Sequence, residues 1–181
     1  MIYGFIGGQG SGKTSIATFL CYLKYLEGQK ILTNMESLKF PTTRIHPIHF
    51  KSKEAMQKLL KGVKQCSILI DEAHLWLDSR NSKKNTGATL FVSQCRKLLK
   101  EQGDFFYTTQ FPNQVDKRLR YNTTLYMYSQ KRVIEENTFF EVKVNQPSGD
   151  WTEEINSFRI NANGIFDLNL YDKFEIVDVE E

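Results

Sequence analysis

The stretch GFIGGQGSGKTS, residues 4–15, places closely spaced glycines just before a lysine and a threonine. Gly7, Gly12, Lys13 and Thr14 fit the pattern G-x-x-x-x-G-K-[ST]. Glycine allows positive φ angles, so consecutive backbone N–H groups can turn inward around phosphate oxygens, and a following helix N-terminus adds partial positive charge. The spacing therefore predicts a loop that binds the phosphates of a nucleoside triphosphate.

ATP and Mg²⁺ are the cofactors that this loop predicts. We expect Lys13 to reach the β and γ phosphates and the Thr14 hydroxyl to hold the metal ion. The residues expected to contact the nucleotide are Gly8, Gln9, Gly10, Ser11, Gly12, Lys13, Thr14 and Ser15.

Two further segments place polar residues after apolar runs. SILIDEAH brings Asp71 and Glu72 to the end of a strand, where open α/β sheets bind ligands. We expect Asp71 to hold Mg²⁺ through water and Glu72 to polarise the attacking water. Gln110 ends DFFYTTQ and is predicted to sense the γ-phosphate if that strand lies between strands 2–6 and 66–71. A helix cap for the acidic pair and a polar strand end without a role for Gln110 stay open as alternatives.

The elements around these residues alternate between strands and helices. Short apolar runs predict strands at 2–6, 30–34, 66–71, 104–110 and 123–129, and helical spacing predicts helices after residue 13, at 52–62 and near 89–100. This alternation predicts an α/β fold with a mainly parallel central sheet flanked by helices. From about residue 131 the pattern changes to RVIE, TFFEVKV and FEIVDV, separated by NQPSGDW and NANG. We expect an ATPase core over 1–130 and an acidic β appendage over 131–181, packed on the core.

Charge is distributed unevenly along the 181 residues, although the net charge is only +3. Residues 1–134 hold 21 Lys and Arg against 9 Asp and Glu, whereas residues 135–181 hold 3 against 12. A basic core suits a polyanionic partner, and a solvated surface balanced by the acidic tail is the alternative.

Cys21, Cys66 and Cys95 show neither a disulfide nor a zinc spacing, so buried thiols are expected. No apolar run is long enough to span a bilayer, and MIYGFIGG has no export-signal pattern. We therefore expect a cytoplasmic protein without a membrane span.

The chain resembles the zonular-occludens-toxin-like (Zot-like) ATPases of the FtsK/HerA superfamily of DNA pumps. The segments that carry the resemblance are the loop at 7–14, ILTN, LIDEAHLWLDSRNSKK, CRKLLKEQGDFFYTTQFPNQVDKRLR and IFDLNLYDKFE. The resemblance implies the RecA-like (ASCE) form of the P-loop fold, with an extra strand between the loop strand and the acidic strand. It also implies a ring, commonly hexameric, around double-stranded DNA.

In such rings an arginine from one subunit reaches the ATP of its neighbour. Arg80 and Arg96 are the candidates here, followed by Arg118 and Arg120, and each of them could instead contact DNA or be a surface charge. Lysine-rich segments 51–64 and 80–102 could follow DNA phosphates without reading bases, or could be solvated helix faces.

These features together predict an ATP-hydrolysing DNA translocase that packages a viral genome in the host cytoplasm. A capsid or portal-like viral protein is the further partner that this role implies. Two other classes stay open. One is a nucleotide-dependent assembly or export switch, and the other is a thymidine-kinase-like nucleoside kinase. This sequence lacks the zinc-binding cysteine pairs that are usual in such kinases.

Overall fold

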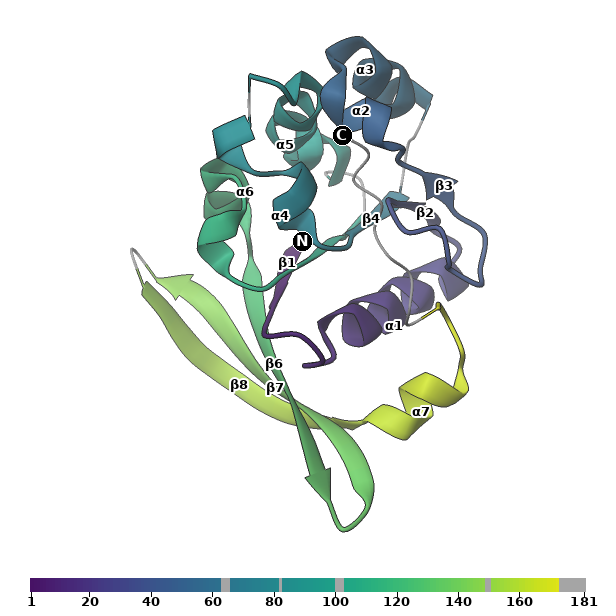
Figure 1. Cartoon of the computed structure of the whole chain (residues 1–181), viewed down its shortest axis with the longest axis vertical. Helices are drawn as coiled ribbons and strands as arrows, with labels where there is room; N and C mark the ends of the chain where they lie inside the picture. Colours follow the sequence, from purple (N-terminus) through teal and green to yellow (C-terminus); the bar gives the residue numbers. More distant parts are fainter. Residues whose placement is uncertain (63–65, 82, 100–102, 149–150, 173–181) are drawn as a thin grey trace.

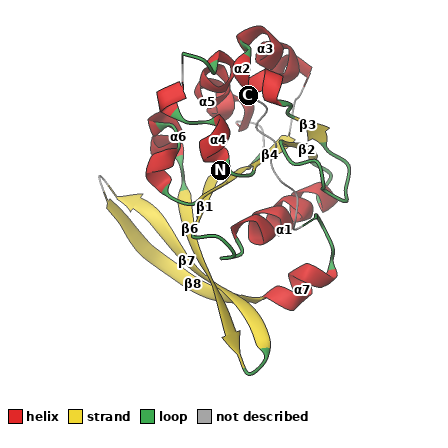
Figure 2. Cartoon of the chain, viewed as in Figure 1, coloured by secondary structure: helices red, strands yellow, loops and turns green. Residues whose placement is uncertain are grey.

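A single sheet of eight strands forms the centre of the molecule (Figures 1 and 2). The computed structural model describes residues 1–62, 66–81, 83–99, 103–148 and 151–172, and for residues 62, 79, 95–99 and 151 it describes the backbone alone. The strands lie in the order β3-β2-β4-β5-β1-β6-β7-β8. They are β1 (Ile2–Ile6), β2 (Lys30–Thr33), β3 (Thr43–Arg44), β4 (Cys66–Ile70), β5 (Phe105–Thr109), β6 (Leu125–Ile134), β7 (Asn137–Ser148) and β8 (Trp151–Asn161).

The first six strands run parallel to one another, whereas β7 and β8 add to the sheet in antiparallel fashion. Helices flank this sheet, so the structure confirms the predicted α/β fold with a mainly parallel sheet. They are α1 (Lys13–Leu26), α2 (Pro47–Lys51), α3 (Lys53–Gly62), α4 (Ala73–Trp76), α5 (Thr86–Leu99), α6 (Lys117–Asn122) and α7 (Ala162–Asp167), with short 3₁₀ turns at Ser79–Asn81 and Pro112–Gln114.

Two apolar clusters cover the two faces of the sheet. On one face, Phe50 of α2, Met56 of α3 and Phe91 of α5 pack on the strands. On the other, Ile16 and Cys21 of α1 pack with Phe106, Phe140 and the α7 residue Ile165. Because both faces are covered, the central strands are mostly apolar, and β4 and β5 are buried along their whole length.

Strand β5, which ends just before Gln110, lies between β1 and β4. This is the strand order on which the predicted role of Gln110 depends. Ile6 of β1 is paired with Thr109 of β5, and Ile70 of β4 with Tyr107. The carboxyl ends of the three strands therefore meet at one edge of the sheet, which is where α/β folds build ligand sites.

The C-terminal third differs in detail from the sequence prediction. Strand β6 continues to Ile134, so it runs across residue 131, and the division of the chain at that residue stays a prediction. NANG forms the start of α7 and not a turn, because the Asn161 side chain accepts a hydrogen bond from Asn163 N and caps the helix. Strand β8 was not predicted, and FEIVDV lies outside the described residues.

Cys21 and Cys66 are buried free thiols, as predicted, and the side chain of Cys95 lies outside the described residues. Burial raises the pKa of the Cys21 thiol to about 12 and that of Cys66 to about 11. Within the described part of the chain, every helix is too short or too polar to cross a bilayer.

Gly87 marks the closest approach of two helices. A Cβ atom at Gly87 in α5 would overlap the His49 carbonyl oxygen of α2 and lie 2.6 Å from that of Ser52. At Gly164 in α7 a Cβ would meet nothing within 4 Å. Gly87→Ala is therefore expected to lower the free energy of unfolding by at least about 2 kcal/mol. Gly164→Ala, the matched control, is expected to raise it by about 0.5–1 kcal/mol. Urea denaturation measures both values, and shifts of the same sign would contradict the helix contact.

Candidate active site

Residues 7–12 form the loop that connects β1 to α1. At two positions the backbone of this loop favours glycine. Gly10 has φ +72° and Gly12 has φ +92°, in the left-handed region that other residues rarely adopt. A Cβ at Gly12 would also overlap the aromatic ring of Phe140 in β7. Gly12 is the N-cap of α1 and offers no side-chain cap. The first N–H groups of α1 are therefore available to an anion.

Lys13 lies over this loop and not in solvent. Its side chain is buried, and Nζ donates a hydrogen bond of 3.2 Å to the carbonyl oxygen of Gly8. Ser11 N donates to the same oxygen, and the Ser11 and Ser129 hydroxyls lie 3.2 Å apart, which ties the loop to β6. The ammonium group is thus held at the place where phosphate oxygens would enter the loop.

Asp71 follows β4 and is fixed by residues from the ends of three other elements. Its Oδ1 accepts hydrogen bonds from Thr14 Oγ1 of α1 at 2.8 Å and from Thr108 Oγ1 of β5 at 2.7 Å. The side-chain amide of Asn34, just after β2, donates to Asp71 O at 2.9 Å and accepts from Asp71 N at 2.8 Å. The orientation of the carboxylate is therefore set by this network.

Burial raises the pKa of the Asp71 carboxyl, and the hydrogen bonds from Thr108 and Thr14 oppose that shift. The charged form of Asp71 is therefore destabilised by its surroundings. A cation beside the carboxylate would offset this penalty, so the aspartate is prepared for a positively charged ligand.

Glu72 adopts φ +46° and ψ +50°, the left-handed conformation that non-glycine residues seldom occupy. Its N–H donates to Thr108 Oγ1 at 2.9 Å, so Thr108 bonds both acidic residues. His74 Nδ1 lies 3.3 Å from Glu72 Oε2. Strained backbone of this kind is retained where surrounding contacts enforce it and is frequent at active sites.

A cavity of about 690 Å³ brings most of the predicted site residues together. Those that line it are Gln9, Gly10, Gly12, Lys13, Thr14, Ser15, Asp71, Glu72 and Gln110. Gly8 and Ser11 line an adjoining cavity of about 510 Å³, which shares Gln9, Gly10 and Lys131 with the first. Gln110 is exposed, as is appropriate for a residue that would touch a ligand.

Three of the four candidate arginines lie outside this cavity. Arg80 is exposed and donates through Nε to both carboxylate oxygens of Asp78, and Arg118 forms an ion pair with Asp116. Arg120 is half-buried, and none of these three lines the cavity. The side chain of Arg96 lies outside the described residues.

Sequence reasoning did not assign a role to several residues that build the site. Asn34 and Thr108 stand in the quoted segments ILTN and DFFYTTQ, but only their position after β2 and at the end of β5 could have identified them. Phe140, Phe166 and Tyr171 line the cavity from segments far away in the sequence.

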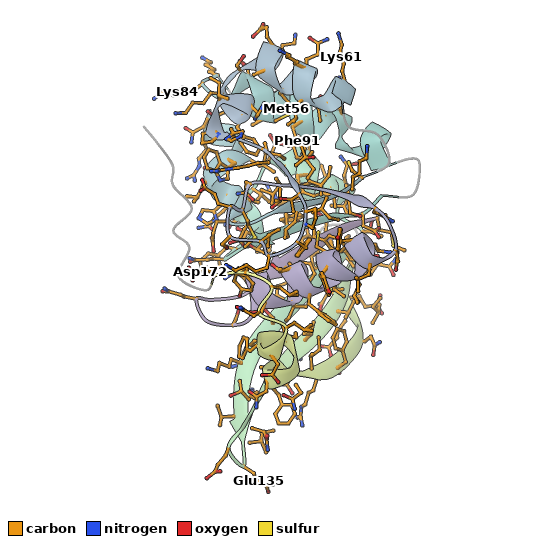
Figure 3. All side chains as sticks on the ribbon, turned by 90° about the vertical axis from the view of Figure 1, so that its right-hand side faces the viewer. Met56, Lys61, Lys84, Phe91, Glu135 and Asp172 are labelled. Carbon is orange, nitrogen blue, oxygen red and sulfur yellow. The ribbon has the colours of Figure 1, made fainter. Side chains whose placement is uncertain are left out.

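The C-terminal segment 170–172 crosses the start of α1 and forms one wall of this cavity. Tyr171 Oη lies 2.7 Å from Ser15 Oγ, Lys39 N donates to Leu170 O, and Asp172 N donates to Ser37 Oγ. Figure 3 shows Asp172 beside α1. Three hydrogen bonds therefore hold this segment in place.

Mg²⁺ fits the oxygen donors at the centre of the site. The metal prefers oxygen ligands, retains several waters and takes one or two protein ligands together with substrate phosphates. The Thr14 hydroxyl and the Asp71 carboxylate lie in contact with each other and face the phosphate-binding loop. These two groups would hold the ion, directly or through water.

Comparison with known proteins identifies the family. The family model described as "Zonular occludens toxin (Zot)" matches residues 1–163, so the chain belongs to the Zot family. The structure is similar to the crystal structure of the N-terminal domain of zonular occludens toxin from Neisseria meningitidis, with a TM-score of 0.66 and 19% sequence identity. That match covers 94% of this chain and 98% of the other. No curated protein sequence matches the chain.

The fold and the family define a nucleotide-binding P-loop ATPase of the Zot family, and this confirms the resemblance seen in the sequence. ATP is the nucleotide that such a family binds, usually with Mg²⁺.

Asp71→Asn is expected to separate stability from ligand binding. The amide keeps an oxygen acceptor for Thr14 and Thr108 but removes the buried charge, so the nucleotide-free protein should be at least as stable as the natural one. The increase in melting temperature caused by Mg²⁺ with ATP should disappear, because the metal loses its charged partner. Thermal denaturation with and without Mg·ATP measures both effects, and a variant that loses stability but keeps the Mg·ATP shift would contradict this account.

Proposed function

We propose that this protein hydrolyses ATP to move double-stranded DNA, as a ring of subunits that packages a viral genome. The observation that carries the proposal is the meeting of Lys13, Thr14, Asp71 and Glu72 in one cavity, with β5 inserted between the strands that deliver them. This strand order and this set of side chains suit hydrolysis driven by positioning and electrostatics.

Five residues of the cavity have defined parts in the proposed reaction. Lys13 and the α1 N-terminus hold the phosphates, while Thr14 and Asp71 hold Mg²⁺, which neutralises charge on the β and γ phosphates when bound. Glu72 orients and deprotonates the attacking water, and its strained backbone keeps the carboxylate at the cavity wall. Gln110 at the end of β5 contacts the γ-phosphate.

An arginine from a neighbouring subunit completes the proposed site. Arg80 lies on the surface just after α4, outside the cavity of its own subunit. An arginine that acts on the ATP of a neighbouring subunit requires such a position. In the single subunit its guanidinium is paired with Asp78. Hydrolysis would then rise with protein concentration as rings assemble.

The proposed DNA-binding surface lies at the end of the molecule built by α2, α3 and the start of α5. Lys53, Lys58 and Lys61 of α3 are exposed there, together with Lys83 and Lys84 before α5. Figure 3 shows Lys61 and Lys84 at this end and Glu135, at the tip of the β6–β7 hairpin, at the opposite end. Because lysines on helices present charge without base readout, such a surface suits transport of any sequence.

The ATPase rate with and without duplex DNA tests the proposal. Glu72→Gln is expected to reduce the rate by about 10²–10⁴-fold because the general base is lost. Lys13→Ala is expected to abolish nucleotide binding. Duplex DNA is expected to increase the natural rate. If DNA does not increase the ATPase rate and the protein transfers phosphate to thymidine, the protein is a nucleoside kinase and the proposal is wrong. Tight ATP binding by a Glu72→Gln protein that stays monomeric at all concentrations would favour a switch.

The DNA surface is tested by charge reversal. Lys58→Glu with Lys61→Glu is expected to abolish DNA stimulation and to reduce the slope of log affinity against log salt by about two units. Lys39→Glu with Lys117→Glu makes the same change of charge at two exposed lysines, one between β2 and β3 and one in α6, and should retain both properties. Equal effects of the two pairs, measured by fluorescence anisotropy with labelled duplex, would contradict the proposed location.

A further inference from the structure

Lys131 stands on β6 at the mouth of the nucleotide cavity. It is paired across the strands with Phe140 of β7, whose ring packs against Gly12 of the phosphate-binding loop. Cross-strand partners point to the same face of a sheet, so Lys131 lies beside the residue that supports the loop. Contact between Phe140 and the loop therefore fixes the position of β6 and β7 relative to the ATP site.

Lys131 lines both cavities that meet at the loop. One contains Lys13, Thr14, Asp71, Glu72 and Gln110, and the other contains residues 8–11. Among the lysines and arginines whose side chains the structure describes, Lys13 and Lys131 are the two that line the larger cavity. Arg80, Arg118 and Arg120 are absent from that lining.

The other cations of β6, β7 and β8 are engaged in ion pairs. Arg132 and Arg159 both contact Glu141, and Lys143 lies 2.9 Å from Glu154. Within the described part of the chain, Lys131 is the cation of these three strands that has no acidic partner. An exposed ammonium group at the mouth of an anion-binding loop is thus available for a ligand, whereas its neighbours are paired with carboxylates.

We propose that Lys131 is a second phosphate-binding cation of the ATP site, contributed by the same subunit, and that it contacts the terminal phosphates of the bound triphosphate. The inference rests on the proposed nucleotide binding. Lys13 would reach the phosphates from α1, and Lys131 would reach them from β6. Two cations in this arrangement favour a triphosphate over a diphosphate, because the γ-phosphate brings the additional negative charge.

Isothermal titration calorimetry with Mg²⁺ and the β,γ-imido analogue of ATP tests the proposal. Lys131→Met removes the charge and keeps a side chain of similar length. We expect binding of the analogue to weaken by about ten- to a hundredfold. Binding of Mg·ADP should weaken by less than about threefold, since the diphosphate lacks the group contacted. Lys131→Arg is expected to retain most of the affinity.

Lys143→Met is the matched control, because Lys143 lines the adjoining cavity on the same hairpin but is paired with Glu154. It should bind the analogue as the natural protein does. Unchanged analogue binding by Lys131→Met would overturn the inference, and so would an equal loss for the analogue and ADP. Lys13→Ala separates the two hypotheses. If the natural protein and Lys13→Ala both fail to bind the analogue, the proposed function fails. If Lys13→Ala loses binding while the natural protein and Lys131→Met both retain it, only the role of Lys131 fails.

Discussion

The hydrogen bonds that converge on Asp71 are the interaction on which the site depends. Thr14, Asn34 and Thr108 come from three separate elements, and each donates to the aspartate side chain or backbone. These bonds link the ends of β2, β4 and β5 to the start of α1. Because the carboxylate is buried, its charged form is disfavoured until a cation arrives, so the same contacts that join the strands prepare a metal site.

The phosphate-binding loop depends in turn on the C-terminal third of the chain. Phe140 packs against Gly12, Ser129 bonds Ser11, and Tyr171 bonds Ser15. Strands β6 and β7 and the segment after α7 therefore support the loop and wall its cavity. Of the acidic residues that the structure describes in this third, Glu135 lies at the hairpin end of the molecule and Asp172 lines the nucleotide cavity.

Local signals explain why the centre of the site could be predicted from the sequence. The glycine spacing before Lys13 and the apolar run before Asp71 each occupy fewer than about ten consecutive residues. Each pattern also has a known physical reason, which is phosphate binding for the glycines and a ligand site at the strand end for the apolar run. Phe140, Lys131 and Tyr171 carry no such signal, since their places depend on antiparallel pairing and on a return of the chain over α1. Helix α7 was missed because asparagine is common both in turns and at helix N-caps.

The most direct test of the account is a crystal structure with Mg²⁺ and the β,γ-imido analogue of ATP. We expect the phosphates to be enclosed by residues 7–14, with Mg²⁺ between Thr14 and Asp71 in place of the present hydrogen bond between them. Glu72 should face the γ-phosphate across a water molecule. A nucleotide bound elsewhere, with Thr14 still bonded to Asp71 and Lys13 still on the Gly8 carbonyl, would contradict the account.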